Sequence, residues 1–191
     1  MRKIVFDIET KNFFSDTGSH DPVSLDISIV CIHDSETDSY KSYLEHELKE
    51  LWPLLEKTDM LIGFNSDHFD IPLLNKYYPG DLTKIKSLDL LKEVKQSLGR
   101  RIKLDTLARA TLGKEKIGDG LEAGRWWKEG NIEALRKYCI EDVRITKELY
   151  EYAKKHGSLK YRDGASIKDV PLDTSSWNIV TTQSITHTLP F

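Results

Sequence analysis

Two carboxylates stand two residues apart at the end of an apolar run near the N-terminus. The run KIVFDIET, residues 3–10, carries Asp7 and Glu9 on either side of Ile8. Along a β-strand, residues two apart point to the same face, so the two carboxylates would lie side by side. Buried like charges repel each other, and a bound cation offsets both the repulsion and the lost hydration. The pair therefore indicates a metal site, while Asp-x-Glu taken alone is a weak signal.

A second group of polar residues follows a later apolar run. Residues 63–72, GFNSDHFDIP, place Asn65 directly after a short buried strand and Asp70 inside an apolar stretch at the start of a helix. Ligands of α/β proteins gather at the carboxyl ends of strands. Capping of the helix would account for Asn65, but it does not account for Asp70. Asp70 is therefore a further candidate ligand.

A tyrosine and an aspartate share one face of a long helix expected near the C-terminus. In KYCIEDVRIT, residues 137–146, Tyr138 and Asp142 are four residues apart and so lie on the same side of the helix. A core aromatic next to a solvated carboxylate would give the same pattern. The pair indicates a functional site only in combination with the carboxylates of the first strand.

The spacing of apolar residues predicts the elements that must bring these groups together. We expect a strand over residues 3–9 and an antiparallel hairpin beside it over residues 25–33 and 34–44. A helix over 45–57 would then lead across to a parallel strand at 60–64. Further helices are expected at residues 69–78, 87–98, 103–113 and 131–157. Strands followed by helices favour one α/β domain.

Three segments have less regular patterns. Residues 113–130 hold five of the 11 glycines and a Trp pair, which favours a loop packed beside the long helix. Residues 159–172 indicate a hairpin that turns at Asp163-Gly164, since this dipeptide accepts the positive φ values of a type I′ turn. Residues 173–191 are rich in Ser and Thr and could form an edge strand or a loose tail. We therefore divide the chain into a domain over 1–157 and a hairpin with a tail over 158–191, packed on that domain.

Composition narrows the functional class. The 191 residues are 39% hydrophobic and 31% charged, which is typical of a soluble globular domain. A net charge of −3 gives no general basic field for coating nucleic acid, although metal ions could hold phosphate locally. Cys31 and Cys139 are far apart in sequence and are expected to be two buried thiols. No apolar segment is long enough for a signal sequence or a membrane span, so we expect a cytoplasmic protein without a membrane partner.

The three motifs, taken in order, resemble the DEDD superfamily of 3′-to-5′ exonucleases. Asp-x-Glu stands on a first strand, Asn-x4-Asp follows a later strand, and Tyr-x3-Asp stands on a C-terminal helix. The tyrosine is similar to that of the DEDDy branch, because the sister branch has a histidine where this chain has Lys137. The segments FDIET and YCIEDV look most like the exonuclease domain of family-B DNA polymerases and its stand-alone relatives. The resemblance covers about residues 1–156.

The resemblance implies an α/β fold of the ribonuclease H-like type. Its mixed central sheet would have three antiparallel strands first, then parallel strands, with helices on both sides. It also implies that four carboxylates hold two divalent cations, Mg²⁺ or Mn²⁺, which hard oxygen ligands suit. Asp7 would bridge both ions, Glu9 and Asp142 would complete the shell of one, and Asp70 would serve the other, directly or through water.

The same resemblance implies roles for residues around the metals. Tyr138 would orient the attacking water rather than remove its proton, since a phenol with a pKa near 10 is a poor base at neutral pH. The backbone at Thr10 and the side chain of Asn65 would touch the terminal nucleotide. Phe64 is a further candidate for substrate contact, by stacking on a base.

The expected function is metal-dependent 3′-to-5′ hydrolysis of single-stranded ends, with DNA slightly preferred and nucleoside 5′-monophosphates released. An exoribonuclease that trims RNA is the nearest alternative, because one acidic site can serve both polymers. A catalytically inactive nucleic-acid-binding module and a small-molecule phosphohydrolase are further alternatives. The chain has no room for polymerase domains, so a polymerase or helicase would act with it only in trans.

Overall fold

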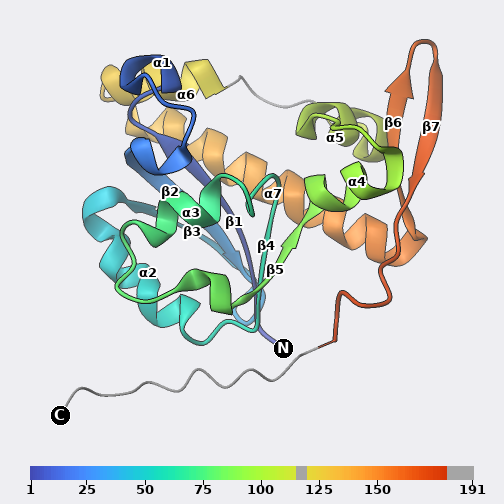
Figure 1. Ribbon diagram of the computed structural model, residues 1–191, viewed down its shortest axis with the longest axis horizontal. Helices are drawn as coiled ribbons and strands as arrows, with labels where there is room; N and C mark the ends of the chain where they lie inside the picture. The colour runs from blue at the N-terminus through green and yellow to red at the C-terminus, as the bar shows by residue number, and fades with distance from the viewer. Residues whose placement is uncertain (115–119, 180–191) are drawn as a thin grey trace.

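A five-stranded mixed sheet forms the centre of the computed structural model, which describes residues 1–114 and 120–179 (Figure 1). The strand order is β3-β2-β1-β4-β5. β1 pairs antiparallel with β2 and parallel with β4, while β3 and β5 extend the sheet on either side. The bounds are β1 Lys3–Thr10, β2 Ile27–Asp34, β3 Ser39–Leu44, β4 Met60–Gly63 and β5 Lys86–Asp89. The expected fold class, a mixed sheet flanked by helices, is confirmed.

Helices cover both faces of this sheet. The longest, α7 (Ile132–His156), packs across β1 and β2, and α5 (Leu104–Leu112) and α6 (Gly120–Lys128) contact α7. The helices α2 (Leu48–Leu55) and α3 (Asp70–Asn75) belong to a second apolar cluster that includes Ile4, Phe6 and Ile8. The short helix α1 (Phe14–Thr17) follows β1, and α4 (Leu90–Leu98) follows β5.

The alternation of side chains along β1 decides where its carboxylates lie. Val5 packs into the apolar cluster that contains α7, whereas Ile4, Phe6 and Ile8 pack into the cluster that contains α2 and α3. Residues two apart share a face, so Asp7 and Glu9 lie on the same side as Val5. The two acids therefore face α7, the helix on which Tyr138 and Asp142 were expected.

Residues 113–130 differ from the loop expected for them. The described part of this segment contains α6, and its two central residues Ala123 and Gly124 are buried. A Cβ atom at Gly124 would stand 2.2 Å from the Phe13 ring, so this glycine allows the close approach of α6 to the segment after β1. Glycine here serves packing within a helix rather than a turn. Residues 115–119 lie outside the described residues.

Residues 87–98 were expected to form one helix, and this expectation is wrong for residues 87–89. Lys86–Asp89 instead form β5, because they pair with β4 at the edge of the sheet. The carboxylate of Asp89 accepts hydrogen bonds from the backbone N–H groups of Leu91 and Lys92, which begins α4 at Leu90. An N-terminal cap thus separates a strand from a helix inside a continuous apolar pattern.

The C-terminal hairpin consists of β6 (Ser158–Asp163) and β7 (Ser166–Pro171), joined at Gly164 with a positive φ of 61°. It stands beside α5 at one end of the molecule (Figure 1). We propose that the boundary between the domain and the C-terminal hairpin with its tail lies at residue 157. Residues 180–191 of the Ser/Thr-rich tail lie outside the described residues. Among the helices of residues 1–114 and 120–179, none has the length and apolar character needed to cross a bilayer.

Candidate metal centre and active site

Three carboxylates from two elements converge where β1 passes under α7. Ligand oxygens of Asp7, Glu9 and Asp142 all lie within 4.8 Å of one another. The contact of the helix with the strand fixes this arrangement, because Cys139 Sγ lies 3.5 Å from the carbonyl oxygen of Asp7. Asp142 follows Cys139 by three residues, nearly one helical turn, and so reaches the same stretch of β1.

The electrostatics of this trio favour a cation. Asp142 is only 3% exposed, and Asp7 and Glu9 are partly buried. Like charges at such distances repel strongly where water is scarce. Three hard oxygen donors in one small volume suit Mg²⁺ or Mn²⁺, which prefer carboxylates over nitrogen or sulfur ligands. The donor set therefore fits the divalent ions that the sequence implied.

Asp70 lies beside β1 but outside the trio. It begins α3 and is 4% exposed. Its carboxyl group accepts hydrogen bonds from its own backbone N–H and from the N–H of Ile8, the residue between Asp7 and Glu9. Burial raises the pKa of the Asp70 carboxyl to about 8, and the nearby Asp89 charge adds to this, while the two backbone hydrogen bonds oppose it. Without a cation the side chain is therefore largely protonated at neutral pH.

The phenol of Tyr138 faces the acidic trio. The residue is 2% exposed, and the Trp126 ring packs edge-on against it with centroids 5.7 Å apart. Burial raises the pKa of Tyr138 well above its usual range, and the charges of Glu9, Asp142 and Asp7 raise it further, as does a side-chain hydrogen bond with Asp142. The hydroxyl therefore keeps its proton at neutral pH and acts as a hydrogen-bond donor rather than a base. Lys137, beside it in sequence, is exposed.

Asn65 is held in an uncommon backbone conformation at the end of β4. Its φ is 68°, and its N–H donates to Asp89 Oδ1 at 2.8 Å. The other oxygen of Asp89 accepts from the N–H of Asp67 at 3.2 Å, so one buried carboxylate holds the turn. Sequence analysis missed Asp89. The available signal was an aspartate directly before the apolar helix run at Leu90, which is typical of an N-cap.

The remaining expected contact residues lie at the ends of β1 and β4. Thr10 ends β1, next to an irregularity in the β1–β2 register between Glu9 and Thr10, and its hydroxyl donates to the carbonyl of Asn12 at 2.8 Å. Phe64 directly follows β4 and packs partly against the apolar cluster that includes α7. The structure thus places both at the carboxyl ends of the parallel strands β1 and β4, and Glu9 lies near the same end of β1.

Comparisons with known proteins agree with this fold. A family model described as the RNase_H superfamily matches residues 4–154. No curated protein matches the sequence. Among solved structures, the family B DNA polymerase from the hyperthermophilic archaeon Pyrobaculum calidifontis is similar, with a TM-score of 0.62 and 18% identity. The match covers 81% of this chain but only 24% of the polymerase, so the likeness is one of fold over part of a much longer protein.

Proposed function

Since the chain belongs to the RNase_H superfamily, we propose that it is a metal-dependent nuclease and, more specifically, a 3′-to-5′ exonuclease acting on single-stranded nucleic acid. The observation that carries the proposal is the convergence of Asp7, Glu9 and Asp142 within 4.8 Å beside the phenol of Tyr138. Such an acidic centre can hold the cations that phosphodiester hydrolysis uses.

Four carboxylates would hold two divalent cations in this proposal. Asp7 would bridge both ions, Glu9 and Asp142 would complete one site, and Asp70 would serve the other. Bound cations would lower the pKa of the attacking water and would offset the negative charge on the attacking and leaving oxygens. Asp70 would lose its proton on joining such a site, since its high pKa reflects burial without a compensating charge.

Tyr138 would orient the water by hydrogen bonding. Because the pKa of its phenol is raised, the group stays protonated; its single O–H, which is hydrogen-bonded to Asp142 in the metal-free protein, would turn to a lone pair of the water once Asp142 binds a cation. The ring has little freedom, since Trp126 packs on one side and α7 holds the backbone. A fixed donor of this kind aligns a nucleophile for an in-line displacement.

The terminal nucleotide would lie over the ends of β1 and β4. We propose that the backbone at Thr10 and the side chain of Asn65 contact its sugar, and that Phe64 contacts its base. DNA is slightly preferred as the substrate in this proposal, and nucleoside 5′-monophosphates are released. A polymerase or helicase in trans would supply ends for trimming.

We also propose that the protein works in the cytoplasm. The free and buried thiols of Cys31 and Cys139 support this, because their side chains are within hydrogen-bonding distance of each other and are not joined. Neighbouring thiols persist where the compartment is reducing.

A gel assay on end-labelled oligonucleotides tests the exonuclease proposal. The full chain is incubated with matched DNA and RNA strands labelled at the 5′ end, in Mg²⁺, in Mn²⁺ or in EDTA. We expect a ladder that shortens one nucleotide at a time in either metal and no cleavage in EDTA. A 5′-to-3′ enzyme would instead release the label at once as a mononucleotide, and an endonuclease would give internal fragments first.

Two variants of equal charge change complete the test. Asp7→Asn keeps the size of the side chain but removes a proposed ligand, and we expect at least a 100-fold slower reaction. Glu50→Gln is the control with the same charge change, because Glu50 is exposed on α2. Undiminished cleavage by Asp7→Asn, with the fold intact by circular dichroism, would exclude the proposed centre.

A further inference from the structure

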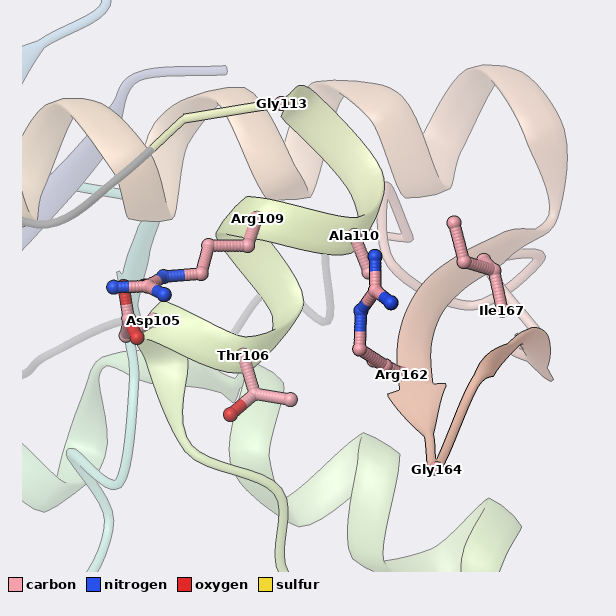
Figure 2. Close-up of a pocket in the computed structure, with 8 residues that line it drawn as sticks. All are labelled: Asp105, Thr106, Arg109, Ala110, Gly113, Arg162, Gly164 and Ile167. Atoms are coloured by element: carbon pink, nitrogen blue, oxygen red, sulfur yellow. The ribbon is translucent and has the colours of Figure 1, made fainter.

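A cleft of about 680 Å³ separates α5 from the C-terminal hairpin (Figure 2). Thr106, Arg109 and Ala110 of α5 line one side, and Arg162, Gly164 and Ile167 of the hairpin line the other. Figure 2 shows Arg162 rising from β6 towards Ala110, while Arg109 turns along the helix to Asp105. A cleft of this size falls within the roughly 300–1,000 Å³ typical of ligand sites.

The walls of the cleft are tied together by polar contacts. Thr111 Oγ1 on α5 donates to the carbonyl of Lys160 at 3.0 Å and accepts from its N–H at 2.9 Å. On the other strand of the hairpin, Ser97 Oγ donates to the carbonyl of Pro171 at 2.6 Å. The hairpin therefore does not hang free, and the cleft exists before any ligand binds.

The segments that build the cleft are basic, although the chain as a whole carries a charge of −3. Residues 99–114 contain five Lys and Arg residues and one Asp, and residues 158–171 contain three Lys and Arg residues and two Asp. Arg109 is paired with Asp105, at 3.1 Å. Arg162 is exposed, and no carboxylate of the described residues stands within ion-pair distance of it. Its guanidinium is thus available to an anion in the cleft.

A short basic segment joins the cleft to the acidic centre. Arg101 Nη2 donates to the side-chain oxygen of Asn65 at 2.7 Å, so Arg101 stands at the proposed substrate end. Asp105, on the rim of the cleft, is four residues further on. Four residues span at most about 14 Å, the length of only a few nucleotides. Lys103, which is exposed, lies between them.

We propose that the cleft between α5 and the β6–β7 hairpin binds the phosphodiester backbone of a single-stranded nucleic acid a few nucleotides from the end held at the acidic centre. The inference rests on the proposed function and names where the rest of the strand goes. Arg162 is the principal phosphate contact, since a guanidinium offers a planar fork of donors to phosphate oxygens. Ile167, 56% exposed at the rim, is placed to contact a sugar or a base.

Fluorescence anisotropy in EDTA tests the proposal without cleavage. Labelled single strands of 20 and of 2 nucleotides are titrated with the unaltered chain, Arg162→Glu and Lys57→Ala over a series of salt concentrations. Lys57 is an exposed cation two residues beyond α2, and Figure 1 shows α2 on the far side of the molecule from the hairpin. We expect Arg162→Glu to weaken binding of the long strand about tenfold and to lower its salt slope by about 0.7, the value for one lost phosphate contact.

Strand length and the control variant decide the outcome. The effect of Arg162→Glu should fall below about twofold on the dinucleotide, whose single phosphodiester cannot reach the cleft from the acidic centre, and Lys57→Ala should bind as the unaltered chain does. Equal affinities of Arg162→Glu and the unaltered chain for the long strand, or no binding by the unaltered chain at low salt, overturn the proposal. Failure of the exonuclease proposal is recognised separately, since a chain that binds through Arg162 but degrades nothing retains the cleft and loses only the reaction.

Discussion

Cys139 Sγ lies 3.5 Å from the carbonyl oxygen of Asp7, so α7 and β1 touch directly beneath the three converging carboxylates. The contact is completely buried on the side of Cys139. One partner in this contact is a backbone carbonyl, so a larger side chain at residue 139 would push α7 away from β1. The separation of Asp142 from Asp7 therefore depends on a side chain that carries no charge.

Enlarging Cys139 should separate the acidic residues. We expect Cys139→Leu to destabilise the fold by about 1–3 kcal/mol through overpacking and to reduce the rise in melting temperature that Mn²⁺ produces. Cys139→Ala is the matched control, because it shortens the side chain without pushing α7 away from β1. Thermal unfolding with and without Mn²⁺ measures both effects. An equal metal-induced shift in Cys139→Leu and Cys139→Ala would contradict the positioning role.

The stability of the metal-free protein should fall as pH rises, because of Asp70. The folded-state pKa of this carboxyl is raised to about 8, above its value of 3.8 in the unfolded chain. Its contribution to stability is therefore fully present below about pH 4 and is lost as pH rises through 8. Asp70→Asn should remove this slope and stabilise the metal-free protein at pH 9 by about 1–3 kcal/mol. Urea unfolding in EDTA from pH 5 to 9 measures it, and parallel curves for both proteins would contradict the assignment.

Arg2 and Asp34 form a buried ion pair whose loss should be costly. Arg2 donates to both oxygens of Asp34, with Nη2–Oδ2 at 2.6 Å and Nε–Oδ1 at 3.1 Å. Arg2→Met leaves the buried carboxylate uncompensated, so we expect a loss of about 3–5 kcal/mol of unfolding free energy. Glu36→Gln is the control, because this second partner of Arg2 is 64% exposed and should contribute less than about 1 kcal/mol. Similar losses in the two variants would show that burial of the pair does not matter.

The ion pair of Arg2 and Asp34 should also affect how the unfolding free energy changes with pH in acid. Burial would raise the pKa of Asp34, but hydrogen bonds from Arg2 and from the N–H of Glu36, with the charge of Arg2, leave it below its usual 3.8. The carboxylate therefore adds stability that is present above pH 4 and is lost as pH falls through the lower folded-state pKa. Asp34→Asn should flatten the pH dependence of unfolding free energy below pH 4. An unchanged acid slope in this variant would count against the ion pair as its source.

Gly63 should tolerate a side chain only if Ser66 loses its own. A Cβ atom at Gly63 would stand 2.4 Å from the Cβ of Ser66, so Gly63→Ala should destabilise the fold by about 1–3 kcal/mol and displace the Asn65 turn. Adding Ser66→Gly should restore most of the loss, whereas adding Ser66→Ala should not, because the Cβ atom remains. Urea unfolding of the two double variants distinguishes them. Equal stability of the two double variants would mean that the clash between the two Cβ atoms is relieved in another way.

The chemistry of the site was largely predictable from local patterns. The period of two along residues 3–10 and the four-residue spacing of Tyr138 and Asp142 predict which side chains share a face, and the structure brings Asp7, Glu9 and Asp142 together. Their catalytic roles stay a prediction. The position of Asp70 outside the trio was not predictable, because it depends on how α3 meets the backbone of β1 at Ile8.

The elements that sequence analysis missed owe their form to distant partners. β5 is a strand because β4 offers it a free edge, and its own residues read equally well as the first turn of α4. The helix α6 has glycines typical of a loop, and the ring of Phe13 against Gly124 explains one of them. The positions of Asp89 and Arg101 at the site follow from their hydrogen bonds with Asn65, which is 24 and 36 residues away from them in sequence.

Alternate residues of β1 pack into two different apolar clusters, so the fold depends on this strand pairing in the correct register. A slip of one residue would turn Ile4, Phe6 and Ile8 towards α7 and would press Asp7 and Glu9 into the cluster around α2 and α3. A misregistered molecule would then bury two uncompensated charges and could not persist. Deleting one residue between positions 3 and 6 should therefore yield protein that fails to accumulate, rather than folded protein that is merely inactive.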